Sequence, residues 1–246
     1  MVKGYRVAAF GGPEVMVWKS LDLGDLAPGD VRVRVGASGI NFAETRMRAG
    51  DYSGQELPFV MGMEVAGTIE SVGAGVTGFS EGDRVFGRVR GAHAEVVDCD
   101  PDHLMLLPDN LSFAQGAAIP VGWLTAWHAL YTVGRMKAGD RILVEAVGGS
   151  VGSAALALAK QAGCWALGTA SRDDKLAHAS SLGCDAVVNY TRDSVSEQVN
   201  ALTDGQGMDI GLMTIGDATA DELIDSMGMD GRAGTRCACG PRRAPS

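Results

Sequence analysis

The chain has 246 residues, of which 46% are hydrophobic and 21% charged, and its formal net charge at pH 7 is -9. This length and apolar content suffice for a buried core in one large or two ordinary domains. Nucleic acids and anionic membranes reward clustered Lys and Arg, so neither is expected as a partner. No apolar run reaches the roughly 20 residues of a membrane span, and the N-terminus lacks a signal peptide's apolar core, which together predict a cytoplasmic protein.

The first 111 residues contain short, alternating apolar segments with frequent glycines, a pattern typical of an all-β, barrel-like domain. Turn chemistry stands at Gly11-Gly12-Pro13 and at Ala27-Pro28-Gly29-Asp30. From Ser112 the pattern becomes helical, is broken at Pro120, and continues to a glycine-bounded joint, so a helical bridge is predicted over 112–139. The candidate strands of the first domain are 5–10, 31–35, 64–72, 83–86 and 94–97.

Residues 141–152 read Arg-Ile-Leu-Val-Glu-Ala-Val-Gly-Gly-Ser-Val-Gly, and an Ala-Leu-rich helical pattern follows directly. This order predicts a buried strand, a glycine turn and a helix start. Three residues keep the spacing that lets backbone approach a pyrophosphate at a helix N-terminus, namely Ala146, Gly149 and Gly152, with Ser150 and Val151 between them. Taken alone, the motif also fits glycines that serve only steric needs of a turn.

The rest of the chain supports the interpretation of this turn as a dinucleotide-binding motif, because strands and helices alternate after it. The predicted strands are 165–171, 186–190, 209–215 and 234–240, and the predicted helices are 173–182, 193–203 and 218–227. Such alternation predicts an α/β domain with a parallel, doubly wound sheet over 140–246. Five strands are counted where the doubly wound fold normally has six, so the sixth strand is expected to be missing. Gly240, at the end of the fifth, is a further candidate cofactor-binding residue.

The residues after the second predicted strand bear on the choice of cofactor. NAD sites usually carry an acid about 20 residues after the glycine turn. Here Ser171, Arg172 and Lys175 instead offer one hydroxyl and two cations suited to a 2′-phosphate. Asp173 and Asp174 argue against this, unless they only complement the dipole at a helix N-terminus. NADPH is therefore the predicted cofactor.

Six motifs follow one another along the chain: Val-Gly-Ala-Ser-Gly-Ile-Asn-Phe-Ala-Glu (35–44), Gly-Met-Glu-Val-Ala-Gly (62–67), Val-Gly-Ala-Gly-Val (72–76), Gly-Asp-Arg-Val (82–85), Ala-Ala-Ile-Pro (117–120) and Leu-Thr-Ala (124–126). Together they resemble the medium-chain dehydrogenase/reductase superfamily. The resemblance is strongest to its zinc-free quinone oxidoreductase branch, which includes zeta-crystallin-like proteins and enoyl reductases. It implies a GroES-like substrate domain over 1–111 joined to a Rossmann domain, with the nicotinamide in the cleft between them.

The same resemblance bears on metal binding. Zinc-dependent relatives place a Cys where this chain has Asn41 and a His where it has Met63, and neither residue is a competent zinc ligand. The lobe that holds a structural zinc is not recognised either, because Cys99 stands alone in that region. Glu64 is retained and is expected to be a structural carboxylate that pairs with backbone or an arginine. Cys237 and Cys239 would share a strand face, yet no nearby His or second Cys pair completes a zinc set, so no metal is predicted.

Candidate catalytic residues also follow from the resemblance. Asn41 and Tyr52 match positions that line the nicotinamide and substrate cleft, and each can donate a hydrogen bond. Arg46 is a third, weaker candidate. A turn-capping role for Asn41 and a plain loop position for Tyr52 are equally open.

Further cofactor contacts are implied for three residues. Thr125 resembles a threonine that touches the nicotinamide end, although it could instead back-bond its own helical turn. Tyr190 matches a tyrosine that lies with the lysine beside the 2′-phosphate, and Thr214 lies where backbone contacts the cofactor. Ser150 replaces a usual glycine and would be strained if its position required a positive φ.

These features predict an NADPH-dependent, zinc-free oxidoreductase. Without a Lewis acid, hydride transfer is easiest to quinones and α,β-unsaturated carbonyl compounds, whose conjugated systems spread the arriving charge. The alternative is a catalytically weak NADPH-binding sensor or partner-binding protein, which the early end of the chain favours. The family resemblance implies a homodimer, whereas loss of the sixth strand would leave a monomer.

Overall fold

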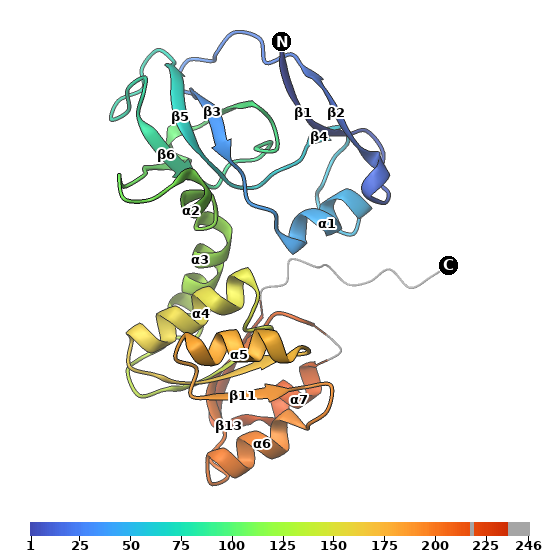
Figure 1. Ribbon diagram of the computed structural model, residues 1–246, viewed down its shortest axis with the longest axis vertical. Coiled ribbons are helices and arrows are strands. Elements are labelled where there is room, and N and C mark those ends of the chain that lie inside the picture. The colour runs from blue at the N-terminus through green and yellow to red at the C-terminus, as the bar shows by residue number, and fades with distance from the viewer. Residues whose placement is uncertain (217–218, 236–246) are drawn as a thin grey trace. The chain divides into compact units, whose positions relative to one another are not determined.

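The structure is a computed structural model that describes residues 1–216 and 219–235. These residues form two compact units that divide after Val121, within the segment predicted as a helical bridge. The N-terminal unit is rich in strands, and the C-terminal unit alternates strands and helices (Figure 1). Among the described residues, no helix combines the length and apolar composition that a membrane crossing requires.

Two antiparallel sheets make up the N-terminal unit. One has the strand order β2-β1-β4, with β1 at Val2–Val7, β2 at Met16–Leu21 and β4 at Phe59–Val60. The other has the order β7-β3-β5-β6-β8, with β3 at Val31–Ala37, β5 at Val65–Val72, β6 at Arg84–Gly87, β7 at Val96–Cys99 and β8 at Leu104–Leu106. Its helices are α1 (Phe42–Ala49), α2 (Phe113–Ala117) and two 3-10 turns (Pro13–Val15 and Pro101–His103).

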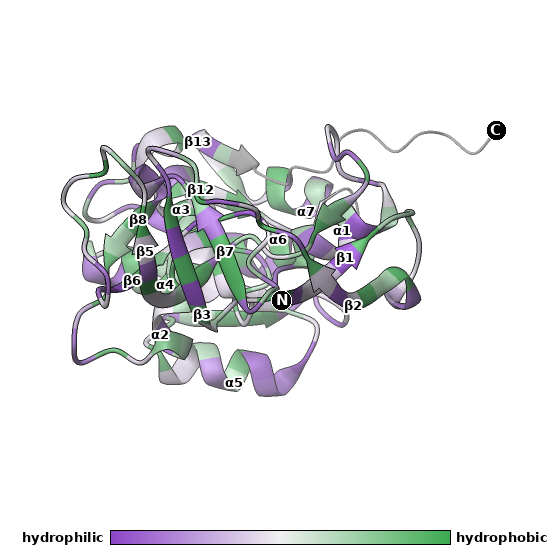
Figure 2. Ribbon diagram, turned by 90° about the horizontal axis from the view of Figure 1, so that it is seen from above, coloured by the Kyte–Doolittle hydropathy of each residue, from purple (hydrophilic) through white to green (hydrophobic). Residues whose placement is uncertain are grey.

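Strict alternation explains why β3 forms a half-buried strand. Val31 and Val33 are completely buried in the core of the unit, whereas Arg32 is half-buried and Arg34 is exposed, an alternation that Figure 2 shows as bands of hydrophobic and hydrophilic colour. Arg32 is held by Asp98 of β7, with 2.7 Å between Nε and Oδ1. The predicted all-β half is therefore confirmed, although β2, β4, β8 and α1 lie outside the strands that the sequence pattern indicated.

The C-terminal unit contains one parallel sheet with the order β11-β10-β9-β12-β13. Its strands are β9 (Arg141–Val144), β10 (Trp165–Ala170), β11 (Ala186–Asn189), β12 (Met208–Met213) and β13 (Met227–Thr235). Its helices are α4 (Ser150–Gln161), α5 (Asp173–Ser181), α6 (Val195–Leu202) and α7 (Ala220–Asp225). Residues of α4 and α5 pack on one face of the sheet and residues of α6 and α7 on the other, so the predicted doubly wound fold is confirmed.

Helix α3 (Pro120–Trp127) begins in the N-terminal unit and ends in the C-terminal unit, where a π-helical segment, His128–Val133, continues it. The helical pattern was predicted to break at Pro120, and the chain does break there, since α2 ends at Ala117 and Pro120 begins α3. A proline is tolerated in a first turn because the N–H that it lacks has no partner there anyway.

The fifth strand of the parallel sheet differs from its prediction. It was expected over 234–240, yet β13 begins at Met227 and pairs with β12 through residues as early as Met208. Glycines at 228, 231 and 234 interrupt the apolar alternation that would have revealed a strand, and the pairing with β12 is what defines it. Gly240, Cys237 and Cys239 lie outside the described residues.

Candidate functional site

A turn between β9 and α4 brings backbone N–H groups to the carboxyl edge of the parallel sheet. Gly149 is the N-cap residue of the 12-residue helix α4, and no described side chain caps that helix. The first turn of a helix has N–H groups without intrahelical partners, and its dipole favours negative charge. The turn therefore offers open donors to an anion.

Close contacts explain why this turn needs glycine. A Cβ at Gly152 would overlap the carbonyl oxygen of Ala146 and would lie 2.7 Å from Val147 Cα, and both of these groups are backbone. A Cβ at Gly168 of β10 would lie 2.8 Å from Val147 side-chain atoms. The helix, the turn and the neighbouring strand are thus packed as tightly as backbone allows.

Strain was expected at Ser150 if its position needed a positive φ, and the structure corrects this. Ser150 is the first residue of α4, and its Oγ lies so close to Gly122 of α3 that a Cβ there would overlap it. The residue of this turn with a positive φ is Ala146, at 46°. A left-handed conformation costs a residue with a Cβ roughly 1 kcal/mol, so the turn stores its strain at Ala146.

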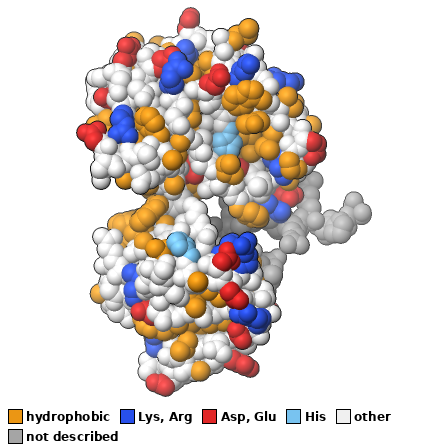
Figure 3. Space-filling model, in the orientation of Figure 1, with side chains coloured by type: hydrophobic (Ala, Val, Ile, Leu, Met, Phe, Trp, Pro, Cys, Tyr) orange, Lys and Arg blue, Asp and Glu red, His pale blue; other side chains and the backbone are white. Residues whose placement is uncertain are grey.

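Beside the turn, the first residues of α5 carry a cluster of exposed charges. Lys175 lies against the turn, because a Cβ on Gly148 would be 2.8 Å from Lys175 Cβ and 3.1 Å from its Cδ. Arg172 donates two hydrogen bonds to Asp174, at 2.9 and 2.6 Å. On the face seen in Figure 3, charges of both signs are likewise interspersed.

The two aspartates that argued against NADPH are each paired with an arginine. Both lie in the first turn of α5. Hydrogen bonds from Asn189 and from Arg192, the latter at 2.8 Å, lower the pKa of Asp173. The hydrogen bonds from Arg172 lower the pKa of Asp174 in the same way. Both acids thus lie at a helix N-terminus, and each also pairs with an arginine of the chain itself.

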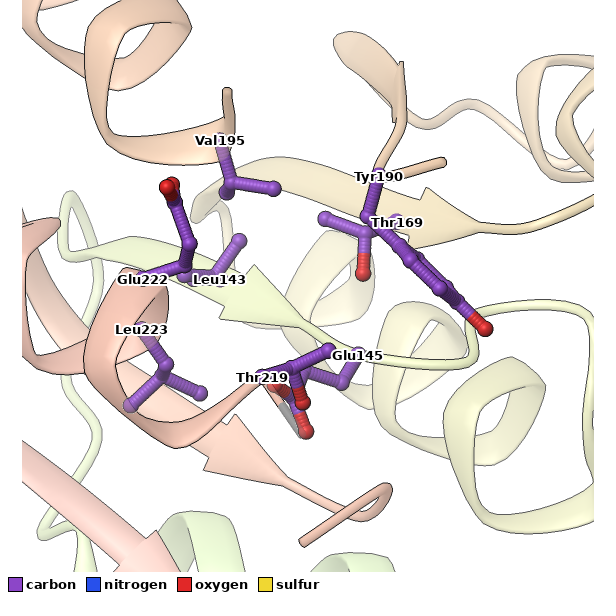
Figure 4. Close-up of a pocket in the computed structure, with 8 residues that line it drawn as sticks. All are labelled: Leu143, Glu145, Thr169, Tyr190, Val195, Thr219, Glu222 and Leu223. Carbon is purple, nitrogen blue, oxygen red and sulfur yellow. The ribbon is translucent and has the colours of Figure 1, made fainter. Parts of the chain in front are cut away.

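A pocket lies at the carboxyl ends of β9, β10 and β11 and is shown in Figure 4. Tyr190, which directly follows β11, is one of its walls. Glu145 is another: it is buried, and its Oε2 accepts hydrogen bonds from the backbone N–H groups of Thr214 (2.8 Å) and Ile215 (3.1 Å). This carboxylate fixes the segment after β12 beside the glycine turn. Thr214 therefore lies near the turn, whereas Gly240 is not described.

The opposite wall of the pocket holds Glu222 of α7. Glu222 accepts hydrogen bonds from Ser194 Oγ (3.1 Å) and Ser196 N (2.9 Å), and the bond from Ser196 lowers the pKa of Glu222. These contacts tie α7 to the first turn of α6. No sequence pattern marks Glu222 as a site residue, because this side chain binds the start of α6 and not its own helix.

In the N-terminal unit, Asn41 lies at the centre of a hydrogen-bond network. It is the N-cap residue of α1, and its side-chain Nδ2 donates to Glu64 Oε1 at 2.7 Å. The second oxygen of Glu64 accepts from the backbone N–H of Val121 at 2.8 Å. Glu64 is buried, with 3% of its surface exposed. It does pair with backbone as expected, and its other partner is an amide rather than an arginine.

A second buried acid, Glu44, completes this network and was not among the predicted site residues. Glu44 Oε2 accepts from Asn41 N at 2.6 Å, and its Oε1 lies 3.5 Å from His93 Nε2. The same histidine nitrogen is 2.9 Å from the carbonyl oxygen of Gly39. Burial raises the pKa of Glu44. The Asn-x-x-Glu spacing of a capping box is the signal that could have identified it.

The remaining candidates have simpler surroundings. Tyr52 is half-buried in the loop after α1, and no hydrogen bond joins its hydroxyl to another described residue. Arg46 pairs with Asp51 at 3.2 Å. Met63 is buried, and Thr125 is half-buried on α3. Within the described residues, no group of three or more His, Cys, Asp or Glu side chains is arranged to hold a metal.

Comparison with known proteins places this geometry in a family. A family model of the alcohol dehydrogenase GroES-like domain matches residues 27–118, and one described as zinc-binding dehydrogenase matches residues 150–236. Quinone oxidoreductase from Pseudomonas aeruginosa is 35% identical over 227 residues, which cover 92% of this chain and 70% of that protein. The chain belongs to the medium-chain dehydrogenase/reductase superfamily. Its resemblance to the quinone oxidoreductase type is thereby confirmed.

Two further relatives of this medium-chain dehydrogenase/reductase are informative. A 2-haloacrylate reductase from Burkholderia is 33% identical over 234 residues, covering 92% of this chain and 70% of that protein. The structure of Escherichia coli quinone oxidoreductase complexed with NADPH superposes with a TM-score of 0.89 at 30% identity, over 93% of this chain and 71% of that one. The chain spans about two thirds of the length of the curated quinone oxidoreductases it matches.

Proposed function

We propose that this protein is a reductase that transfers a hydride from NADPH to a quinone or an α,β-unsaturated carbonyl compound without zinc. The observation that carries the proposal is the uncapped N-terminus of α4 at a turn packed too tightly for side chains, with Lys175 lying against the turn. The relatives named quinone oxidoreductase and 2-haloacrylate reductase support this class of acceptor.

The residues of the C-terminal unit fit a dinucleotide. In this proposal the open N–H groups of the turn, from Gly149 to Gly152, bind the pyrophosphate. Ser171, Arg172 and Lys175, with Tyr190 beside them, bind the 2′-phosphate. The backbone at Thr214 and the hydroxyl of Thr125 orient the nicotinamide end. When bound, NADPH supplies the hydride from C4 of its nicotinamide ring.

The acceptor needs a hydrogen-bond donor at its carbonyl oxygen, because negative charge develops there as the hydride arrives. Asn41 donates one Nδ2 N–H to Glu64, and an NH₂ group has a second N–H that can donate to the acceptor. The hydroxyl of Tyr52 can donate as well and can deliver a proton to the reduced oxygen. We assign polarisation of the acceptor to these two residues. A conjugated acceptor also stabilises this negative charge, because its own π system spreads it over several atoms.

Turnover and cofactor preference test the proposal together. Purified protein should consume NADPH in the presence of ortho- and para-quinones or enones, and should do so faster than with NADH. The double variant Arg172→Ala/Lys175→Ala should weaken NADPH binding and leave NADH binding nearly unchanged, because NADH has no 2′-phosphate. Equal losses for both cofactors would remove the phosphate site from the proposal.

The outcomes also separate the two functions that the sequence left open. Tight NADPH binding with no turnover of any acceptor would favour the sensor or partner-binding function over the reductase. A cytoplasmic location and a homodimer stay predictions, which fractionation of cells and the mass of the particle in solution would test.

A further inference from the structure

We propose that Glu64 is a positioning residue for the reaction: its carboxylate holds the side-chain amide of Asn41 in one orientation by accepting from it and from the first turn of α3 at once. This inference rests on the proposed function, in which Asn41 donates to the acceptor. It adds to that function a residue that touches neither substrate nor cofactor.

The surroundings of Glu64 leave its carboxylate little freedom. Ser38 Oγ donates to the backbone carbonyl of Glu64 at 2.8 Å, which fixes the chain there. Gly39 lies so close that a Cβ at this position would overlap Glu64 Oε1 and would be 2.6 Å from its Cδ. Among the described residues, no Lys or Arg lies within ion-pair distance of Glu64. The carboxylate therefore depends on two N–H donors, Asn41 Nδ2 and Val121 N.

These two donors explain why residue 64 is an acid. The backbone N–H of Val121 can only donate, so it requires an oxygen at one arm of the side chain. If the other arm is also an oxygen, Asn41 must turn its Nδ2 toward it. A glutamine has one oxygen and one NH₂ group, and it can accept from only one of the two donors. Only the acid accepts from both.

The orientation has a chemical consequence at Asn41. The two ends of an asparagine amide have nearly the same shape, so sterics alone do not decide which end faces which way. A carboxylate does decide, because a charge-assisted hydrogen bond is about twice as strong as a neutral one. With Nδ2 held by Glu64, its second N–H has a fixed direction and is the group that donates to the acceptor oxygen.

The variant Glu64→Gln reverses this arrangement without changing the shape of the side chain. Its oxygen should accept from Val121 N, whose direction the backbone fixes, so its NH₂ group faces Asn41. Asn41 then turns its amide over and accepts through Oδ1. Both hydrogen bonds of residue 64 are kept, and Glu44 N keeps its bond to the backbone oxygen of Asn41, so the variant should fold. The Asn41 side chain gives up the capping contact that it accepts from Glu44 N, and its donor is displaced. Glu70→Gln is the matched control, since Glu70 is an exposed acid of strand β5, which begins directly after Glu64, and it pairs with Arg34.

Nuclear magnetic resonance reads the orientation directly and does not depend on activity. The side-chain NH₂ signals of Asn41 are assigned by their loss in Asn41→Asp. One of the two protons should be shifted downfield by the carboxylate in the wild type, and this shift should disappear in Glu64→Gln but not in Glu70→Gln. Unchanged signals in Glu64→Gln would overturn the proposal.

A double-mutant cycle then tests whether the orientation matters for the reaction. Glu64→Gln and Asn41→Ala should each lower kcat/KM for the quinone by about tenfold, and the double variant should be no worse than Asn41→Ala. The Kd for NADPH should stay within about twofold of the wild type, because Glu64 acts through Asn41 and not on the nucleotide. Multiplied losses, about a hundredfold in the double variant, would show that Glu64 does not act through Asn41.

Failure of this inference can be told apart from failure of the reductase proposal. Turnover that persists unchanged in Asn41→Ala would leave the reductase in place and overturn the roles of Asn41 and Glu64 alone. If Glu64→Gln does not fold, the variant Asn41→Asp/Glu64→Gln restores the hydrogen bond with its donor and acceptor exchanged. It should fold, bind NADPH and be as slow as Asn41→Ala, and wild-type rates in it would overturn the proposal.

Discussion

Two strand-to-helix turns of this molecule solve the same local problem in opposite ways. The turn from β9 to α4 leaves the helix N-terminus open, because Gly149 has no side chain to cap it and no acid lies in the first turn. The turn from β3 to α1 closes its helix N-terminus, because Asn41 is the N-cap and Glu44 of the first turn binds the Asn41 N–H. The open N-terminus leaves its N–H donors available to an anion. At the closed N-terminus, N–H donors are instead used in hydrogen bonds within the chain.

The difference shows how the two turns are built from different kinds of residue. The open turn depends on what is missing, since side chains at Gly148, Gly152 or Gly168 would meet atoms already in place. The closed turn depends on buried carboxylates at positions 44 and 64. Adding a side chain at a glycine should therefore disturb the open turn, and neutralising a buried carboxylate should disturb the closed turn.

The largest effect is expected from Gly152→Ala, which fills the tightest contact of the open turn. The new Cβ would meet the backbone of Ala146 and Val147, which cannot move aside as a flexible side chain could. Overpacking of this kind costs about 3 kcal/mol, more than alanine gains over glycine in a helix. Urea unfolding should show the loss, and NADPH binding should be abolished.

The control for that variant is Ala157→Gly, on the exposed side of the same helix. It should cost about 1 kcal/mol through helix propensity alone and leave NADPH binding intact. If Gly152→Ala were no less stable than the wild type, the close packing at this turn would not be what requires glycine.

A second variant, Gly149→Asp, gives the open turn the closing group of the other. A carboxylate at the N-cap should accept from the free N–H groups of α4 and stabilise the helix by up to about 1 kcal/mol. The same charge should repel the pyrophosphate and raise the Kd for NADPH by at least about tenfold. Fluorescence titration with NADPH measures the second effect, and thermal unfolding measures the first.

Gly149→Ser separates capping from charge, since serine caps without a negative charge. It should weaken binding less than the aspartate does. Equal Kd values for the two variants would mean that the N-terminus of α4 does not face a phosphate.

The buried acid Glu44 of the closed turn should make the free energy of unfolding depend on pH. Burial raises the pKa of Glu44 above 4.5, so the folded state holds a proton that the unfolded state has already released. Stability from this group is fully present below the unfolded pKa and is lost as pH rises through the folded pKa, by about 1.4 kcal/mol for each unit of difference. His93 and Glu64 are the titratable neighbours that act on it.

Glu44→Gln removes this proton and should flatten that part of the curve. Chemical unfolding at a series of pH values from acid to neutral measures the slope, and Glu81→Gln, an exposed acid of the same unit, is the control. If the free energy of unfolding depended on pH in the same way in the wild type and in Glu44→Gln, the pKa of Glu44 would not be raised in the folded state.

The two turns also differ in how far the sequence alone could predict them. The glycine turn could be predicted because its strand, glycines and helix are consecutive, and the same holds for the capping spacing of Asn41 and Glu44. The partners of Glu64 could not, since Asn41 and Val121 are 23 and 57 residues away along the chain and only the folded unit brings them together. The start of β13 was missed for a related reason: its glycines show no alternation, and β12 alone makes it a strand.

The smallest effect concerns the exposed charges beside the open turn. Arg172 donates two hydrogen bonds to Asp174, which a 2′-phosphate would have to replace. Asp174→Asn should release the arginine and tighten NADPH binding by a few-fold, the range expected for an exposed ion pair. NADH has no 2′-phosphate and should bind as before. Asp204→Asn, an equal change of charge on the exposed loop between α6 and β12, should alter neither Kd. A gain shared equally by both cofactors would mean that Asp174 acts through net charge and not through its hold on Arg172.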